Sequence, residues 1–208
     1  MRESGILMHI TSLPAPYGIG TMGKDAYAFV DFLVRAGQRY WQILPLTPTG
    51  YGDSPYQSLG ACAGNHYLID LDRLADEGLL KKEEIQNIPW GSNPARVDFG
   101  AMYAHRMNVL RLAFQRFAPD EAYETFVEQN RSWLEDYALF TALKDTLGGK
   151  PWLDWPEALR LRKGDALAEK RRELSDEIRL QYFVQYEFDR QWKALRSYAN
   201  AKGVRIIG

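Results

Sequence analysis

Three short apolar runs stand out along the chain, and stretches with helical spacing lie between them. The runs cover residues 5–10, 39–44 and 204–207, and their branched and aromatic side chains predict buried strands. Residues 25–36 carry apolar side chains at every third or fourth position, which predicts an amphipathic helix between the first two runs. A strand, a helix and a second strand predict a right-handed βαβ unit with parallel strands.

A mainly helical insertion is expected between the second and third strands. Apolar positions at helical spacing recur through residues 101–147 and again through residues 165–201. Residues 66–71 alternate apolar and polar side chains, which favours a short strand outside the main sheet. The sequence contains no linker or repeat, so residues 1–208 are predicted to form a single α/β unit, with residues 66–165 as the approximate insertion.

Composition and charge narrow the possible functions. The 208 residues carry a formal net charge of −1, which gives no electrostatic reason to expect nucleic acid or an anionic membrane as a partner. No apolar stretch approaches the roughly 18 residues of a membrane span, and the first apolar run is too short for a secretion signal, so a cytoplasmic protein is expected. The three histidines lie far apart, and neither a metal nor another cofactor is expected. Cys62, the single cysteine, is predicted to be a small buried side chain.

Residues 45–65 form the segment with the most distinctive chemistry. The segment contains three prolines and four glycines, which direct the backbone through specified turns, and it has no arginine or lysine. A long loop without periodicity is usually functional or disordered, and aromatic residues with little charge argue against disorder. Tyr51 and Tyr56 offer flat rings that carry a hydroxyl, and short polar side chains accompany them: Asp53, Ser54, Gln57 and Ser58. This mixture suits the C–H faces and hydroxyls of a sugar, although both tyrosines could instead only pin the loop.

The predicted topology places two loops on the same side of the sheet. Loops that leave the carboxyl ends of parallel strands share one face, and barrel enzymes carry their active sites there. Residues 9–20 and 45–65 are these two loops, so His9 is expected on the same side as the tyrosine-containing segment. His9 could meet a sugar hydroxyl or serve only as a hydrogen-bonded rim histidine, and the sequence leaves both open.

Four ordered motifs resemble the opening of the 4-α-glucanotransferase family, which includes amylomaltases and disproportionating enzymes. The motifs are Gly5-Ile-Leu-Met-His-Ile-Thr-Ser-Leu-Pro14, Tyr17-Gly-Ile-Gly20, Arg39-Tyr-Trp-Gln-Ile-Leu-Pro-Leu46 and Thr49-Gly-Tyr-Gly-Asp-Ser-Pro-Tyr-Gln-Ser58. Similarity in Gly64-Asn-His-Tyr-Leu-Ile-Asp70 and Gly203-Val-Arg-Ile-Ile-Gly208 extends the resemblance to both ends of the chain. Ile10 and His66 stand where family members often have proline, but neither lies in the Ser-Pro-Tyr core of the fourth motif.

The resemblance implies the N-terminal part of a (β/α)₈ TIM barrel, with the first three strands in this chain and the catalytic carboxylates in later strands. It implies retaining transfer of α-1,4-glucan segments between maltooligosaccharides through a covalent intermediate. Tyr56 and Ser54 match family positions that contact donor sugars, and Tyr51 is a candidate stacking residue. The further substrate-binding candidates are Asp53, Gln57 and His9. No catalytic residue is assigned, because one loop carboxylate cannot supply both the nucleophile and the acid.

Two other functions stay open on the sequence alone. The loop could belong to a stand-alone carbohydrate-binding module, or the chain could come from a related α-glucan hydrolase. Three strands cannot close a barrel that needs eight, so an N-terminal fragment that is inactive alone is expected. The exposed strand edges of such a fragment favour its self-association.

Overall fold

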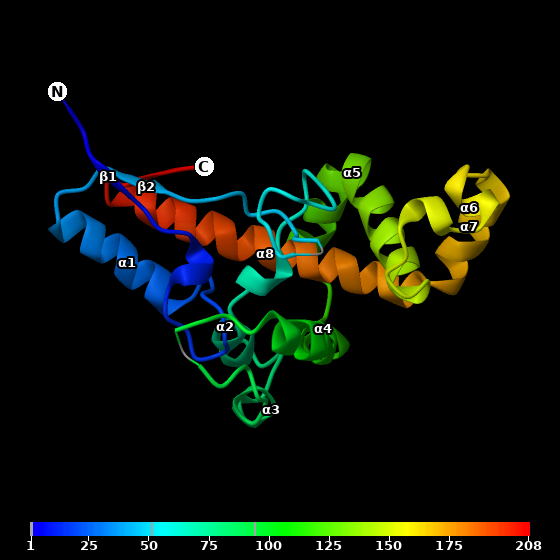
Figure 1. Cartoon of the computed structure of the whole chain (residues 1–208), viewed down its shortest axis with the longest axis horizontal. Helices are drawn as coiled ribbons and strands as arrows, with labels where there is room; N and C mark the ends of the chain where they lie inside the picture. The colour runs from blue at the N-terminus through cyan, green and yellow to red at the C-terminus, as the bar shows by residue number, and fades with distance from the viewer. Residues whose placement is uncertain (1, 51, 94) are drawn as a thin grey trace. The chain divides into compact units, whose positions relative to one another are not determined.

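The computed structural model describes residues 2–50, 52–93 and 95–208, which fall into two compact units. Unit 1 contains residues 2–118 and 187–208, and unit 2 contains residues 119–186. The long helix α8 (Ser175–Ala201) supplies residues to both units. Figure 1 shows the elements of each unit, coloured from the N-terminus to the C-terminus.

Unit 1 is built on a parallel sheet of three short strands. The strands are β1 (Gly5–Leu7), β2 (Tyr40–Gln42) and β3 (Arg205–Ile207), and they pair in the order β1-β2-β3. The three predicted strands and their parallel direction are therefore confirmed, although each strand is shorter than predicted. β1 ends early because the chain turns after His9 into a 3-10 helix, η1 (Ile10–Ser12).

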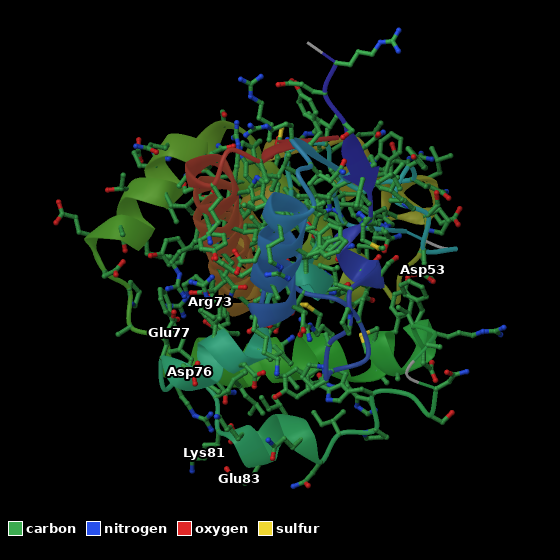
Figure 2. All side chains as sticks on the ribbon, turned by 90° about the vertical axis from the view of Figure 1, so that its left-hand side faces the viewer. Asp53, Arg73, Asp76, Glu77, Lys81 and Glu83 are labelled. Carbon is green, nitrogen blue, oxygen red and sulfur yellow. The ribbon has the colours of Figure 1, made fainter. Side chains whose placement is uncertain are left out.

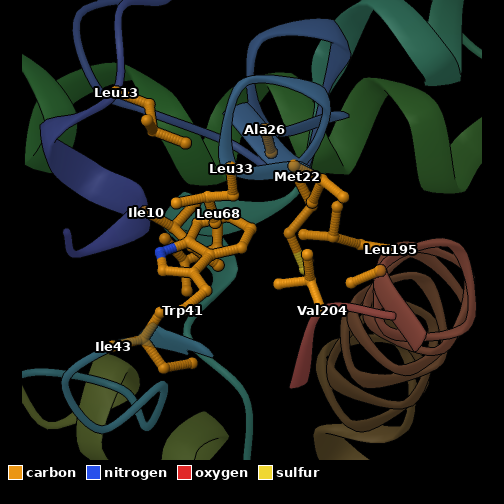
Figure 3. Close-up of a cluster of buried hydrophobic side chains, with 12 residues drawn as sticks. Ile10, Leu13, Met22, Ala26, Leu33, Trp41, Ile43, Leu68, Leu195 and Val204 are labelled. Carbon is orange, nitrogen blue, oxygen red and sulfur yellow. The ribbon is translucent and has the colours of Figure 1, made fainter. Parts of the chain in front are cut away.

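The core of unit 1 lies between one face of this sheet and two helices. The central residues of the strands, Ile6, Trp41 and Ile206, share one level of the register and pack with apolar side chains of α1 (Lys24–Arg35) and α8. Trp41 is fully buried, and its indole Nε1–H donates to the carbonyl oxygen of Met8 at 2.7 Å. In Figure 3, Trp41 lies beside Leu68 in the centre of this cluster.

The opposite face of the sheet carries side chains that are exposed. Successive side chains of a strand point to opposite faces, so Leu7, Gln42 and Ile207, which share a register level, lie on the face away from α1 and α8. Leu7 is 56% exposed and Ile207 is 45% exposed. Two large apolar side chains of the edge strands, on either side of Gln42, are therefore exposed on this face.

Helices α2 (Leu71–Asp76), α3 (Lys82–Gln86) and α4 (Phe99–Arg116) also belong to unit 1. The predicted strand over residues 66–71 is wrong, because this segment forms the 3-10 helix η2 (His66–Leu68) and then begins α2. Oδ1 of Asn65 accepts the N–H of Tyr67 at 2.9 Å, and Oδ1 of Asp70 accepts the N–H of Arg73 at 3.0 Å. These side chains cap the starts of η2 and α2 by accepting backbone N–H groups. The alternation of apolar and polar residues does not reveal such caps.

Asp70 connects the start of α2 to two distant parts of unit 1. Its Oδ2 accepts a hydrogen bond from the hydroxyl of Thr21 at 2.6 Å, and its backbone N–H donates to Oε1 of Gln191 at 2.7 Å. Gly23, the residue before α1, has no room for a side chain, because a Cβ there would lie 1.9 Å from Oδ2 of Asp70. The side chain of Asp70 therefore joins the segment before α1 to the start of α2, and its backbone N–H joins both to α8.

Unit 2 consists of helices and the turns between them. The helices are α5 (Glu121–Thr146), η3 (Trp152–Asp154), α6 (Glu157–Arg160), α7 (Gly164–Glu173) and the first part of α8. Their shared apolar cluster contains Leu139, Leu143, Trp155, Leu159 and Leu167. Within the part of the chain that the structure describes, no helix is long and apolar enough to cross a membrane.

Candidate functional site

The candidate loop, residues 45–65, leaves the sheet at the carboxyl end of β2. The N–H of Ile43 donates to the carbonyl oxygen of Ile207 at 2.8 Å, so contact with the sheet continues just past the strand. The N–H of Asn65 donates to the carbonyl oxygen of Leu46 at 2.7 Å. This last bond closes the base of the loop and fixes both of its ends in unit 1.

The outer part of the loop is a hydrogen-bonded hairpin. Thr49 and Ser58 form an antiparallel bridge, and the N–H of Gly50 donates to the carbonyl oxygen of Gln57 at 3.1 Å. Ser54 begins a second turn, because its carbonyl oxygen accepts the N–H of Gln57 at 3.1 Å and its Oγ accepts the N–H of Tyr56 at 3.3 Å. The turns that the prolines and glycines predict are therefore present.

Tyr103 of α4 holds the tip of this hairpin. Its hydroxyl donates to Oδ1 of Asp53 at 3.1 Å and lies 3.3 Å from the carbonyl oxygen of Gly50. Burial and the neighbouring Asp53 carboxylate raise the pKa of Tyr103, so the hydroxyl remains a neutral donor at physiological pH. Asp53 has a φ of 54°, in the left-handed region that aspartate tolerates better than most residues. Asp53 is therefore engaged in the structure of the loop.

Several polar or aromatic side chains of the loop face solvent. Tyr56 is 75% exposed, Gln57 is also exposed, and Ser54 is partly buried. Tyr51 lies outside the described residues. Figure 2 shows Asp53 well apart from the charged residues of α2 and α3, such as Arg73 and Glu83. Tyr103, and not Tyr56, makes the pinning contact, so the Tyr56 ring remains available to a ligand.

His9 lies at the carboxyl end of β1, next to the start of the candidate loop. Its Nδ1 accepts the N–H of Leu44 at 3.2 Å, and burial lowers its pKa, so the neutral ring carries its proton on Nε2. Within the described ranges, no residue accepts a hydrogen bond from Nε2. His9 is thus a hydrogen-bonded rim histidine, one of the two alternatives that the sequence left open, and the contact of its Nε2–H with a sugar hydroxyl stays a prediction.

Two features of the site differ from what the sequence indicates. The sequence does not indicate the role of Tyr103, because its partner Asp53 lies 50 residues earlier and its only signal is an aromatic side chain next to the apolar stripe of α4. The prediction that Cys62 is buried is wrong. Cys62 is exposed together with Leu59 and Ala61, so no apolar element covers this stretch. The described residues contain no cluster of histidine, cysteine and acidic side chains that could hold a metal ion.

His66, just after the loop, should make the stability of unit 1 sensitive to acid. Burial, and then the nearby charge of Arg106, lower the pKa of His66 from 6.5 to about 3. Between these values the unfolded chain binds a proton that the folded chain does not, so stability falls as the pH drops below 6.5. From pH 6.5 to pH 5 we expect a loss of up to about 2 kcal/mol in the free energy of unfolding.

Urea denaturation at pH 7 and pH 5 measures this loss. His66→Gln, which cannot take up the proton, should flatten the dependence on pH, leaving the smaller contribution of His9. Equal dependence on pH in the wild type and in His66→Gln would show that His66 does not carry this effect.

The fold and the loop together define a class of protein. This is an α/β protein with a polar, nearly uncharged loop at the carboxyl ends of parallel strands, where proteins of this class usually bind their ligands. The family model described as 4-alpha-glucanotransferase matches residues 8–208. The chain therefore belongs to the 4-α-glucanotransferase family.

Curated relatives and solved structures agree with this assignment. The 4-alpha-glucanotransferase of Thermus thermophilus is 50% identical over 213 residues, and that of Clostridium butyricum is 47% identical over 203 residues. These alignments cover 100% and 97% of this chain, but only 42% of each relative. The chain thus spans well under half the length of these relatives.

The structural comparison covers the same portion. The amylomaltase from Streptococcus agalactiae, solved in complex with acarbose, superposes with a TM-score of 0.96 at 47% identity. The superposition covers 100% of this chain and 43% of that chain. The amylomaltase from Corynebacterium glutamicum, at 18% identity, superposes with a TM-score of 0.72 and shows the shared fold.

Proposed function

We propose that this chain is the N-terminal part of a 4-α-glucanotransferase and that its candidate loop holds donor sugars. One observation carries this proposal: the loop that bears the family motif turns Tyr56 toward solvent, while Tyr103 and Asp53 hold its backbone. A preformed loop loses little entropy when it binds a ligand. Tyr56 and Ser54 are proposed to contact the glucose units nearest the bond that is cleaved.

The remaining candidates have supporting roles in this proposal. His9 Nε2–H and the Gln57 side chain would donate to sugar hydroxyls, and Asp53 acts mainly through its bond with Tyr103. Tyr51 is proposed to stack on a sugar ring, on the basis of the motif alone. None of these side chains is assigned to the bond-breaking step, so the function of this chain in catalysis is to position the glucan.

We further propose that the three strands are the first three of a (β/α)₈ barrel, interrupted by the insertion over residues 66–165. The exposure of Leu7 and Ile207 supports this, because the face of the sheet away from α1 and α8 would line the barrel interior. The nucleophilic carboxylate and the acid–base carboxylate would then come from later strands. In this arrangement the 208 residues alone would bind glucan without transferring it.

The proposed reaction is a double displacement with retention. One carboxylate attacks the anomeric carbon of an α-1,4-glucan while the other protonates the departing glycosidic oxygen. The second carboxylate, now a base, removes the proton from the 4-hydroxyl of an acceptor sugar, which attacks the same carbon and releases the enzyme. An acceptor sugar in place of water makes the reaction a transfer.

Incubation of the full-length protein with maltotriose tests this function. Chromatography of the products should show glucose together with oligosaccharides longer than maltotriose, which only transfer can produce. The 208-residue chain alone should show neither. Maltose and glucose without longer products would instead indicate a hydrolase, and unchanged maltotriose would contradict the proposal.

A further inference from the structure

Unit 2 contains a hollow whose walls combine aromatic rings with a fixed ion pair. The cavity has a volume of about 270 Å³. Leu139, Phe140 and Trp155 line its apolar part, and Trp152, Asp136 and Arg162 line the rest. These six residues, which we call the Trp152 hollow, lie within unit 2 and share no residue with the candidate loop.

The aromatic wall is unusually accessible for a tryptophan-rich segment. The rings of Phe140 and Trp155 stack with centroids 5.3 Å apart at an angle of 29°. Trp155 is buried in the cluster, whereas Trp152 keeps 47% of its surface exposed at the mouth of the hollow. An exposed indole beside an apolar cavity offers a flat surface on which the C–H face of a pyranose ring can pack.

The backbone at Arg162 ends helix α6 in a left-handed turn, in which the N–H of Arg162 donates to the carbonyl oxygen of Leu159 at 3.0 Å and the N–H of Lys163 donates to that of Ala158 at 2.9 Å. Arg162 follows the short helix α6 and has a φ of 53°, in the left-handed region that glycine adopts without cost. Its Nη2 donates to both carboxylate oxygens of Asp136, at 2.9 Å and 2.8 Å. Exposed ion pairs add little to stability, so the pair does not explain why arginine occupies this position. The left-handed conformation belongs to the helix end, so Arg162 contributes to the hollow through its guanidinium group.

The ion pair still has hydrogen-bonding capacity for a ligand. A carboxylate has about four acceptor positions, of which Nη2 of Arg162 occupies two and Nη2 of Arg171, 3.5 Å from Oδ1, approaches a third. A guanidinium has five N–H donors, and the bonds of Arg162 to Asp136 engage only those on Nη2. Because the two groups fix each other, a ligand that binds them immobilises few further torsions. The hollow therefore presents an apolar floor beside fixed donors and acceptors, which is the chemistry of a sugar ring and its hydroxyls.

We propose that the Trp152 hollow binds a glucose unit of an α-glucan, as a second glucan contact made by unit 2. The choice of glucan as the ligand rests on the proposed function, and the location rests on the geometry of the hollow. The volume is slightly below the roughly 300–1,000 Å³ of pockets that enclose drug-sized ligands. The hollow would therefore hold one ring against its wall, with weak affinity, and would add to the binding of long glucans by avidity.

Calorimetric titration with maltoheptaose tests this proposal in variants that all carry Tyr56→Ala. The Tyr56→Ala substitution removes the main side chain of the candidate loop. Tyr56→Ala should retain measurable binding, and Tyr56→Ala with Trp152→Ala should bind at least about fivefold more weakly than Tyr56→Ala. The matched control is the double variant Tyr56→Ala with Leu153→Ala. Leu153 is 64% exposed and does not line the hollow, so this double variant should have the same affinity for maltoheptaose as Tyr56→Ala.

Arg162→Gly separates binding from structure. Glycine relieves the left-handed backbone, so the melting temperature should stay unchanged or rise, while the affinity for maltoheptaose in the Tyr56→Ala background should fall about threefold or more. The second site would be overturned if the double variant Tyr56→Ala with Trp152→Ala bound maltoheptaose as tightly as Tyr56→Ala. It would also be overturned if Tyr56→Ala alone did not bind maltoheptaose. If Tyr56→Ala binds maltoheptaose as tightly as the wild type, and adding Trp152→Ala weakens that binding, the result would support the hollow. The same result would contradict the proposed role of the candidate loop.

Discussion

Alanine in place of Arg106 is expected to lower the free energy of unfolding of unit 1 by about 3 kcal/mol. Arg106 is fully buried in α4, and its Nη2 donates to the carbonyl oxygens of Tyr67 and Ile69. Truncation leaves both carbonyl oxygens without this donor and opens a cavity beside Trp90, whose ring centroid is 5.9 Å from the guanidinium carbon. Burial lowers the pKa of Arg106 to about 10, so removal of a poorly solvated cation offsets part of the loss.

Amide hydrogen exchange provides the measurement, because unit 1 can be followed separately from unit 2. The amide of Met22, which donates to the carbonyl oxygen of Leu68 at 2.9 Å, should exchange more than 100-fold faster in Arg106→Ala. Arg106→Met, which fills most of the space but donates no hydrogen bond, should cause a smaller loss. Asn108→Ala, at an exposed position of the same helix, is the control and should leave the rate unchanged. Exchange at the wild-type rate in Arg106→Ala would contradict this account of the buried cation.

Tyr56→Ala in the full-length protein should reduce glucan transfer about 100-fold. Tyr56 is 75% exposed, so its loss should not affect stability, whereas a misplaced donor sugar would react slowly. Tyr56→Phe keeps the ring and removes only the hydroxyl, so it should retain more activity, with a loss of about tenfold. Initial rates of maltotriose disproportionation measure both variants.

Leu59→Ala is the matched control for Tyr56, because Leu59 is 43% exposed in the same loop and has no sugar-binding group. Its transfer rate should equal that of the wild type. Equal losses in Leu59→Ala and Tyr56→Ala would indicate a general disturbance of the loop. Wild-type kinetics in Tyr56→Ala would remove Tyr56 from the site.

The main elements of unit 1 are predictable because local patterns decide them. The apolar runs and the helical spacing of residues 25–36 locate the sheet and α1 (Lys24–Arg35), since both elements bury one continuous apolar face. The segment over residues 66–71 is misread because the side chains of Asn65 and Asp70 cap helix starts there. The hydrogen bonds of single side chains outweigh a weak alternation of apolar and polar residues.

The sequence predicts the turns of the candidate loop, but not the contact that holds its tip. The composition of residues 45–65 indicates a sugar-binding loop, and the structure shows a hairpin with Tyr56 exposed. The contact between Tyr103 and Asp53 joins segments 50 residues apart, and no local pattern encodes such a contact. The left-handed backbone at Arg162, which ends α6, is equally hidden, because only coordinates reveal a left-handed residue that is not glycine.

A crystal structure of the full-length protein with a bound maltooligosaccharide tests the central claim most directly. The account predicts that glucose units contact the Tyr56 ring or hydroxyl and the Ser54 hydroxyl, with Asp53 still bonded to Tyr103. A maltooligosaccharide bound at the catalytic carboxylates while Tyr56 and Ser54 both remain in solvent would contradict it.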